Sequence, residues 1–361
     1  YSHINSNIHR AAHKLAREAT AAHEAARETI ATHLNCAHAH ELIFTSGTTD
    51  SINLVSNTLA LSGKISAGDK IIISALEHHA NIVPWQMLCQ RTGASLEIIP
   101  IHEDGIFDMD AYEGMLDESV KLVSISHVSN ALGTVNPVST IISMAKQHDA
   151  LVLVDGAQAA PHFKIDVQEL NCDFYVFSGH KIYGPTGIGI LYGKEQILNE
   201  LPPWRGGGEM IKEVTFEHTT YNDLPFKYEA GTPDIEGAIA MAAAIDYMNA
   251  IGMEKIAAHE SYLEQKTTAA LKEINGIKLY GTAPQKAAVV SFRIEGIHHY
   301  DLGTLLDQMG VAVRTGHHCC QPLMARYGIT GTVRASFAAY NTEQEVDAFI
   351  EALHKATRML S

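Results

Sequence analysis

Short apolar runs alternate with segments of helical periodicity through the first two thirds of the chain. Seven runs have the length and composition of strands: 41–45, 70–74, 96–101, 121–127, 151–155, 174–177 and 187–192. Helical patterns lie between them, at 50–61, after Ala80 and at 141–148. This alternation predicts βαβ units, and so an α/β fold with a mostly parallel seven-stranded sheet and helices on both faces. Active sites of such sheets lie beyond the carboxyl ends of the strands.

The flanking segments predict a second, smaller domain. An alanine-rich helix is expected over 7–35, and the aperiodic segment 202–232 is interpreted as a loop or hairpin. The strongly helical stretch 233–274 is interpreted as a domain connector. The α+β pattern that follows predicts strands at 287–294, near 311–315 and at 332–337, with helices at 300–309 and from Thr342. We therefore expect a large domain over 1–250 and a small C-terminal domain over 251–361.

Composition narrows the function classes. The 361 residues carry a formal net charge of −15, which argues against nucleic acid or an anionic membrane as a partner. No apolar run reaches the length of a membrane span, and the residues from Tyr1 onward lack the pattern of a signal peptide. Five cysteines, an odd number, do not suggest a disulfide framework. We expect a cytoplasmic protein.

Two predicted strands are followed by groups of opposite charge. Asp155 ends the apolar run 151–155, and Lys181 follows the run 174–177 in the segment Ser178-Gly179-His180-Lys181. A lysine amine forms a Schiff base with an aldehyde, and an acid beside a pyridine nitrogen keeps the ring able to accept electrons. The pair therefore indicates a site for pyridoxal phosphate (PLP), with Ser178 and His180 as phosphate donors. A surface lysine and an ordinary strand-end acid are the alternative.

Other predicted strand ends carry residues that suit the same cofactor. Thr48 and Thr49 open a helix, whose amides and hydroxyls can bind an anion, although a plain helix cap is the alternative. His78 can stack on a flat ring and move protons near neutral pH. Gln158 can donate to a phenolic oxygen of the cofactor, and Asn130 can contact the cofactor or a substrate carboxylate.

The segment Arg314-Thr315-Gly316-His317-His318-Cys319-Cys320 brings basic groups and thiols together. Zinc is one interpretation, but zinc sites usually space their cysteines two or more apart because adjacent side chains diverge. A nucleophilic cysteine whose thiolate is stabilised by nearby basic groups fits better, and we expect no metal site. Arg334 is a candidate for binding an α-carboxylate through two parallel hydrogen bonds from its guanidinium. Alternatively, it is a strand arginine that pairs with a surface acid.

Together these segments resemble the group II cysteine desulfurases of the SufS/CsdA type, which are fold-type I PLP-dependent enzymes of the class-V aminotransferase family. The similarity extends almost end to end. Two features differ: the family usually has a further segment upstream of Tyr1, and it usually has a small non-thiol residue at the position of Cys320. The matching segments are Asn7-Ile8-His9-Arg10, Gly47-Thr48-Thr49, Glu77-His78-His79-Ala80-Asn81-Ile82-Val83-Pro84-Trp85-Gln86, Val154-Asp155-Gly156-Ala157-Gln158, Ser178-Gly179-His180-Lys181, Glu229-Ala230-Gly231-Thr232-Pro233, Arg314-Thr315-Gly316-His317-His318-Cys319 and Arg334-Ala335-Ser336.

The resemblance implies a role for each matching residue. Lys181 would hold PLP and shuttle protons, Asp155 would pair with the pyridinium, and Cys319 would attack the sulfur of L-cysteine, leaving L-alanine and a Cys319 persulfide. That persulfide would pass to a SufE-, CsdE- or SufU-like acceptor protein for Fe–S cluster assembly. Thr232 would reach the phosphate of the neighbouring subunit in a homodimer. The resemblance also implies cofactor contacts for His78, Thr48, Thr49, Gln158, Ser178 and His180. His78 would in addition be catalytic. The implied substrate contacts are Asn130, Arg334, Arg314 and Arg10.

Other functions stay open from the sequence. The same scaffold can act mainly as a selenocysteine lyase, because selenium leaves more easily than sulfur. An aminotransferase needs no nucleophilic cysteine, so the Cys319 loop counts against it. An inactive partner module that retains PLP is the alternative if the segment upstream of Tyr1 is essential. Cys320 can compete with Cys319 as the nucleophile or resolve a persulfide internally.

Overall fold

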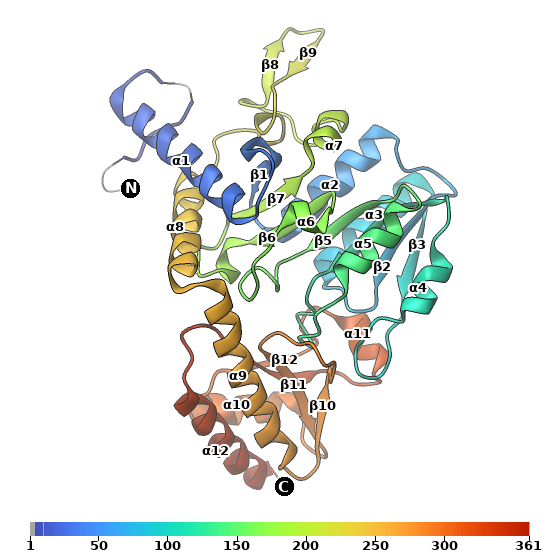
Figure 1. The fold of residues 1–361 in the computed structure, drawn as a ribbon, viewed down its shortest axis with the longest axis vertical. Coiled ribbons are helices and arrows are strands. Elements are labelled where there is room, and N and C mark those ends of the chain that lie inside the picture. Colours follow the sequence, from blue (N-terminus) through green and yellow to red (C-terminus); the bar gives the residue numbers. More distant parts are fainter. Residues whose placement is uncertain (1–3, 10, 361) are drawn as a thin grey trace.

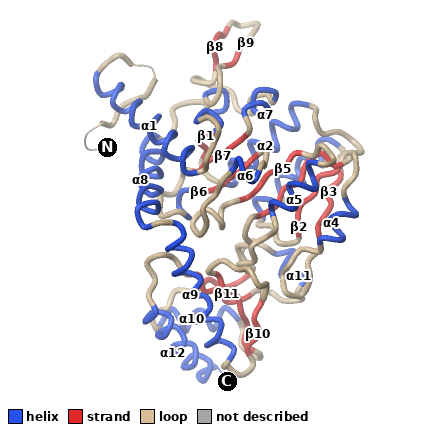
Figure 2. Tube along the Cα trace, in the orientation of Figure 1, coloured by secondary structure: helices blue, strands red, loops and turns tan. Residues whose placement is uncertain are grey.

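A seven-stranded sheet forms the centre of the larger part of the molecule (Figures 1 and 2). The computed structural model describes residues 4–9 and 11–360. The strand order is β1-β7-β6-β5-β4-β2-β3, parallel from β3 to β6, with β7 antiparallel to both neighbours. The strands are β1 (Leu42–Thr45), β2 (Lys70–Ser74), β3 (Ser95–Ile99), β4 (Val120–Ser126), β5 (Leu151–Asp155), β6 (Phe174–Ser178) and β7 (Gly189–Gly193). The predicted mostly parallel, seven-stranded sheet is confirmed.

Both faces of this sheet are buried. Along β5, Val152 and Val154 pack into one core, while Leu153 packs into the other. Successive side chains of a strand point to opposite faces, so continuous apolar runs like this one bury the sheet on both sides. The first core is closed by α1 (Lys14–His33), α5 (Val138–Lys146) and α8 (Ile235–Ile251), and the second by α2 (Thr48–Ser62), α3 (Val83–Thr92) and α7 (Glu195–Glu200). Helices on both faces are therefore confirmed.

The C-terminal part has its own antiparallel sheet, in the order β10-β11-β13-β12. A third apolar cluster, from Leu263 to Ala356, packs this sheet against helices α9, α10 and α12. Helix α9 runs from the larger part into the smaller one (Figure 1). The elements are α9 (Met253–Lys272), β10 (Ile277–Tyr280), β11 (Val289–Ile294), α10 (His299–Gln308), β12 (Arg314–Gly316), α11 (Gln321–Arg326), β13 (Thr332–Ser336) and α12 (Glu343–Leu360).

Several predicted boundaries are wrong. The first helix begins at Lys14 rather than at residue 7, because His13 is its N-cap and accepts a hydrogen bond from the Ala16 amide through Nδ1. The connector is two helices, since the chain turns at Gly252 with a φ of 98°. Strand β12 lies at Arg314–Gly316 rather than near 311–315, because its pairing begins opposite Arg334.

Some elements were not predicted. These are α4 (Met109–Met115), α6 (Val167–Leu170), α7, β10, α11 and four 3-10 turns, η1 (Ala39–Glu41), η2 (His79–Asn81), η3 (Gly179–Lys181) and η4 (Phe226–Tyr228). The segment 202–232 contains the hairpin of β8 (Ile211–Val214) and β9 (Thr219–Tyr221), which projects from the molecule (Figure 1). Among the described residues, no helix combines the length and apolarity needed to cross a bilayer.

Candidate active site

Residues from five strand ends meet around one cavity of about 140 Å³. Parallel strands place their carboxyl ends at one edge of a sheet, so Asp155 at the end of β5 lies beside the turn after β6 that carries Lys181. Nine of the predicted site residues line this cavity: Thr48, Thr49, His78, Asn130, Asp155, Gln158, Ser178, His180 and Lys181. The topology therefore collects these predicted positions, which are spread over more than a third of the chain.

Asp155 and Lys181 form the charged pair of the cavity. Burial raises the pKa of Asp155 and lowers that of Lys181, while the attraction between the two charges opposes both shifts. The Ala157 amide donates to Asp155 Oδ1 at 2.9 Å and orients the carboxylate. Gly156 must be small, because a Cβ there would lie 2.1 Å from the Tyr175 ring. A lysine whose ammonium form is disfavoured is suited to nucleophilic attack on an aldehyde.

An anion site forms where α2 begins. The Thr48 amide and the Thr48 hydroxyl both lie 2.8 Å from Ser178 Oγ, so the start of the helix and the end of β6 are joined at this point. Gly47 precedes the helix with a φ of 143°, and a Cβ on it would come within 3.2 Å of the same Ser178 Oγ. Thr49 and His180 complete this side of the cavity. Helix amides with hydroxyls around them are suited to a phosphate.

His78 presents a neutral imidazole ring to the cavity. Burial lowers its pKa to about 4, and the nearby Lys181 charge acts in the same direction. Its Nδ1 accepts a hydrogen bond from the Ala80 amide at 3.0 Å, so the proton is assigned to Nε2. A neutral, oriented ring can stack on a flat cofactor and exchange a proton.

Gln158 is held by two residues that the sequence did not point out. Its Nε2 lies 3.3 Å from His162 Nε2, and His162 Nδ1 lies 2.6 Å from Glu260 Oε2 on α9. His162 and Glu260 are both buried, and Glu260 Oε1 has no hydrogen-bond partner among the described residues. This relay links the cavity to the helix that enters the C-terminal part. His162 follows Gln158 by one helical turn, but Glu260 is about a hundred residues away and gave no sequence signal.

The Cys319 turn lies beside the cavity and has a strained backbone. His318 and Cys319 have φ values of 52° and 58°, a left-handed conformation that is costly for two consecutive non-glycine residues. The His79 amide donates to the Cys319 carbonyl at 2.8 Å, and Asn130 Nδ2 donates to the His318 carbonyl at 2.7 Å. Cys319 is partly exposed, whereas Cys320 is fully buried.

Two arginines lie beside the same turn. Arg314 and Arg334 are direct partners across β12 and β13, an arrangement of like charges that is unfavourable without an anion. Burial lowers the pKa of Arg334 to about 10, and the Arg314 charge adds to this effect. Arg334 Nη1 donates to the Asn130 carbonyl at 2.7 Å, while its buried Nε has no partner in the described part of the chain. The guanidinium pair is therefore suited to a carboxylate. The alternative was a salt bridge of Arg334 with a surface acid, and the described residues form none.

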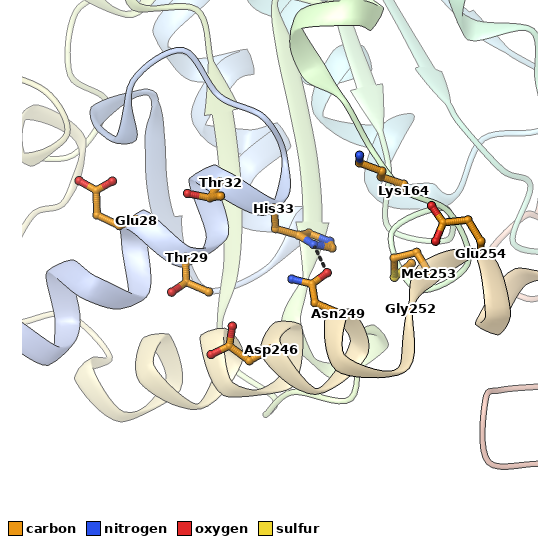
Figure 3. Close-up of a pocket in the computed structure, with 10 residues that line it drawn as sticks. All are labelled: Glu28, Thr29, Thr32, His33, Lys164, Asp246, Asn249, Gly252, Met253 and Glu254. Carbon is orange, nitrogen blue, oxygen red and sulfur yellow. Dashed lines mark hydrogen bonds between the residues drawn. The ribbon is translucent and has the colours of Figure 1, made fainter.

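Two further predicted site residues are not part of this arrangement as the structure describes it. Thr232 lines a different hollow, between the start of α2 and the loop around Trp204. Arg10 falls outside the described residues. A larger hollow of about 540 Å³ lies between α1 and α8 and is lined by acidic and polar side chains, with His33 Nδ1 3.1 Å from Asn249 Oδ1 (Figure 3). None of its lining residues was predicted to carry chemistry.

One histidine cluster has the composition and spacing of a candidate metal site. Within the described part of the chain, His9, His23 and Glu24 bring their ligand atoms within 4.8 Å of one another. Glu24 already accepts a hydrogen bond from Arg27 Nε at 3.1 Å. A guanidinium in contact with the carboxylate disfavours a second cation there.

The residues around the cavity fit PLP in their chemistry. The cavity is lined by an acid, a lysine, a neutral imidazole ring and an anion site. These are the four contacts that the cofactor needs. Asp155 would face the ring nitrogen, Lys181 the aldehyde, and Thr48 and Ser178 the phosphate. When bound there, PLP supplies the electron sink for reactions at an amino-acid α-carbon.

The fold and this cavity define a fold-type I enzyme of the PLP-dependent kind. The aminotransferase class-V family model matches residues 1–349. Cysteine desulfurase from Salmonella agona is 50% identical over 361 residues, which cover all of this chain and 88% of that protein. A probable cysteine desulfurase from Xylella fastidiosa is 51% identical over 360 residues, or 86% of its length.

Solved structures agree with these relatives. The cysteine desulfurase CsdA from Escherichia coli superposes with a TM-score of 0.92 at 40% identity, covering 99% of this chain and 88% of that one. An apo cysteine desulfurase from Thermococcus onnurineus NA1 gives a TM-score of 0.95 at 38% identity, covering 99% and 89%. The chain belongs to the aminotransferase class-V family and, within it, to the cysteine desulfurases.

Proposed function

We propose that this protein binds PLP in the Asp155–Lys181 cavity and converts L-cysteine into L-alanine, with transfer of the sulfur to Cys319. The observation that supports this most directly is the position of the partly exposed Cys319 turn, which is tied to the cavity through Asn130 and His79. An aminotransferase has no use for a thiol held there. The identities of 50% and 51% to cysteine desulfurases support the same reaction.

Each residue has a defined task in this proposal. Arg334 and the Asn130 amide bind the substrate carboxylate, and the Lys181 amine carries a proton at the α-carbon. The Cys319 thiolate attacks the substrate sulfur as the bond from Cβ to sulfur breaks. One cysteine and one protein thiol give one alanine and one Cys319 persulfide, so atoms and electrons balance without an oxidant. His78 and Gln158 orient the cofactor ring.

The proposal extends to a homodimer and a sulfur acceptor. Thr232 lines a hollow separate from the cavity of its own chain, which supports a contact with the site of a neighbouring copy. A protein acceptor is the natural destination for a persulfide on an accessible turn, and Fe–S cluster assembly in the cytoplasm is the process that the family resemblance implies. Sedimentation should show a dimer, and Thr232→Ala should release PLP more readily.

The decisive experiment is incubation of the purified, PLP-loaded protein with L-cysteine. We expect alanine and, with a reductant present, sulfide in equal amounts. Cys319→Ser should bind the substrate but form no alanine. Borohydride should fix the cofactor to the peptide that contains Lys181, and a label on any other lysine would contradict the assignment. Alanine formation by Cys319→Ser at the wild-type rate would show that Cys319 is not the sulfur acceptor.

A further inference from the structure

Cys320 is a buried thiol that the proposed reaction does not use. It stands directly after the proposed nucleophile, yet its side chain is fully buried, while Cys319 is partly exposed. Burial raises the pKa of the Cys320 thiol to about 12, so it remains protonated near neutral pH. A buried, protonated thiol is a poor nucleophile and a poor resolving group.

The same thiol has a specific hydrogen-bond partner. Cys320 Sγ lies 3.1 Å from Asn130 Oδ1 and 3.5 Å from the His318 carbonyl. Because the thiol is protonated, it donates to Oδ1. The other polar atom of the Asn130 side chain, Nδ2, donates to the His318 carbonyl at 2.7 Å. The amide group of Asn130 is therefore fixed at both of its polar atoms by the Cys319 turn.

The orientation of this amide matters for substrate binding. An asparagine side chain has two hydrogens on nitrogen, and one of those on Asn130 is used by His318. Asn130 also lines the cavity, and its backbone carbonyl accepts from Arg334. With Oδ1 turned toward Cys320, the second N–H is left for an anion beside Arg334. A flipped amide would instead direct a carbonyl oxygen at the carboxylate and repel it.

We propose that Cys320 is a positioning residue whose thiol holds the Asn130 amide with an N–H, rather than the carbonyl oxygen, toward the substrate carboxylate. It is not a second sulfur acceptor. The identity of the substrate rests on the proposed function. The orientation of the amide does not, because any amino-acid carboxylate beside Arg334 would meet it.

Two substitutions separate the hydrogen bond from the packing. Cys320→Ser keeps a donor of similar shape, and Cys320→Ala removes it. Cys172→Ala is the matched control, because Cys172 is equally buried in the same apolar cluster, but it does not line the cavity and, in the described hydrogen bonds, does not contact Asn130. All three variants shorten or remove a buried thiol, so a general effect of packing would appear in each of them.

The experiment measures KM and kcat for L-cysteine, and the affinity for L-alanine from the absorbance of the bound cofactor. Cys320→Ala should raise KM and the alanine Kd about three- to tenfold, which is about 0.7–1.4 kcal/mol and the size of one net hydrogen bond. Its kcat should stay within about twofold of wild type, and Cys320→Ser should restore both affinities to within about twofold, below half a kcal/mol. Cys172→Ala should change neither affinity.

Mass spectrometry of protein treated with L-cysteine should locate the added sulfur on Cys319 alone. Unchanged affinities in Cys320→Ala, or the added sulfur on Cys320, would overturn the proposal. If the wild-type protein makes no alanine from cysteine, the proposed function fails, but the titration with L-alanine still reports on the Asn130 orientation.

Discussion

The buried ion pair between Arg27 and Glu229 should be the most costly polar contact to break in the larger part of the molecule. Arg27 Nη1 and Nη2 donate to the two oxygens of Glu229 at 2.7 and 2.9 Å, and Arg27 is only 2% exposed. Glu229 also accepts from the Phe44 amide at 2.7 Å. The pair therefore joins α1 to β1 and to the loop that carries Thr232.

The size of the effect follows from what each substitution leaves behind. Arg27→Met keeps most of the side-chain volume but leaves Glu229 buried with only the Phe44 amide as a strong partner. Removing one member of a buried pair costs about 3–5 kcal/mol, because the remaining charge stays desolvated. Replacing both members with apolar residues removes that penalty. The double variant Arg27→Met/Glu229→Leu should then cost about 1–2 kcal/mol, mainly because the Phe44 amide and the Leu42 carbonyl lose a partner.

Urea unfolding followed by tryptophan fluorescence tests this prediction. Trp85 and Trp204, the two tryptophans of the chain, both belong to the α2–α3 side of the large sheet and report on its unfolding. Lys64→Met is the control, because it breaks the exposed pair of Lys64 with Glu200 and should leave stability unchanged. An Arg27→Met variant as stable as the control, or a double variant less stable than Arg27→Met, would refute the reasoning.

Three other predictions concern the site itself. Arg334→Lys should raise KM for L-cysteine by about tenfold or more while PLP stays bound, because an ammonium cannot match the two-point geometry of a carboxylate; an unchanged KM would assign Arg334 a structural role. His162→Leu should weaken PLP retention and shift the absorbance of the cofactor, while His162→Gln should retain part of the affinity because an amide can still contact Gln158 and Glu260; equal retention in both would show that the relay does not support Gln158. The apoprotein should lose stability as the pH falls from about 6.5 to 4. Burial lowers the pKa of His78 and His127 to about 4 and that of His318 to about 3. Over this range the unfolded chain therefore binds protons that the folded chain does not. Burial raises the pKa of Glu77 to about 7, which has the opposite effect over part of this range and offsets about one of the three protons; a melting temperature that is constant over this range would contradict the histidine assignment.

The main sheet could be predicted because its signal is local. Each strand is a short run of apolar residues, and the runs end on polar residues such as Asp155 and Ser178. Parallel connection then places those ends at one edge without any further information. For this reason, most of the cavity could be assembled from strand ends alone. The short helices α6 and α11 were missed, because four to six residues show too little periodicity to recognise.

Contacts between the two parts of the chain could not be predicted in this way. Glu260 reaches the cavity through His162 and Gln158 from helix α9, whose packing is decided in three dimensions. The left-handed backbone at His318 and Cys319 is also invisible in the sequence, since neither residue is a glycine or an asparagine. Such a conformation persists only when surrounding contacts stabilise it.

These unpredicted contacts show that both parts of the molecule contribute residues to the site. The strand ends of the large sheet supply the groups around the cavity, and the C-terminal part supplies Cys319 and Arg334. Asn130 is one point where the two meet, because its side chain holds the Cys319 turn and its carbonyl holds Arg334. A displacement of the C-terminal part would therefore move the thiol and the carboxylate site together. In the proposed reaction, this arrangement would fix the Cys319 thiol relative to the substrate carboxylate, which an in-line attack on sulfur requires.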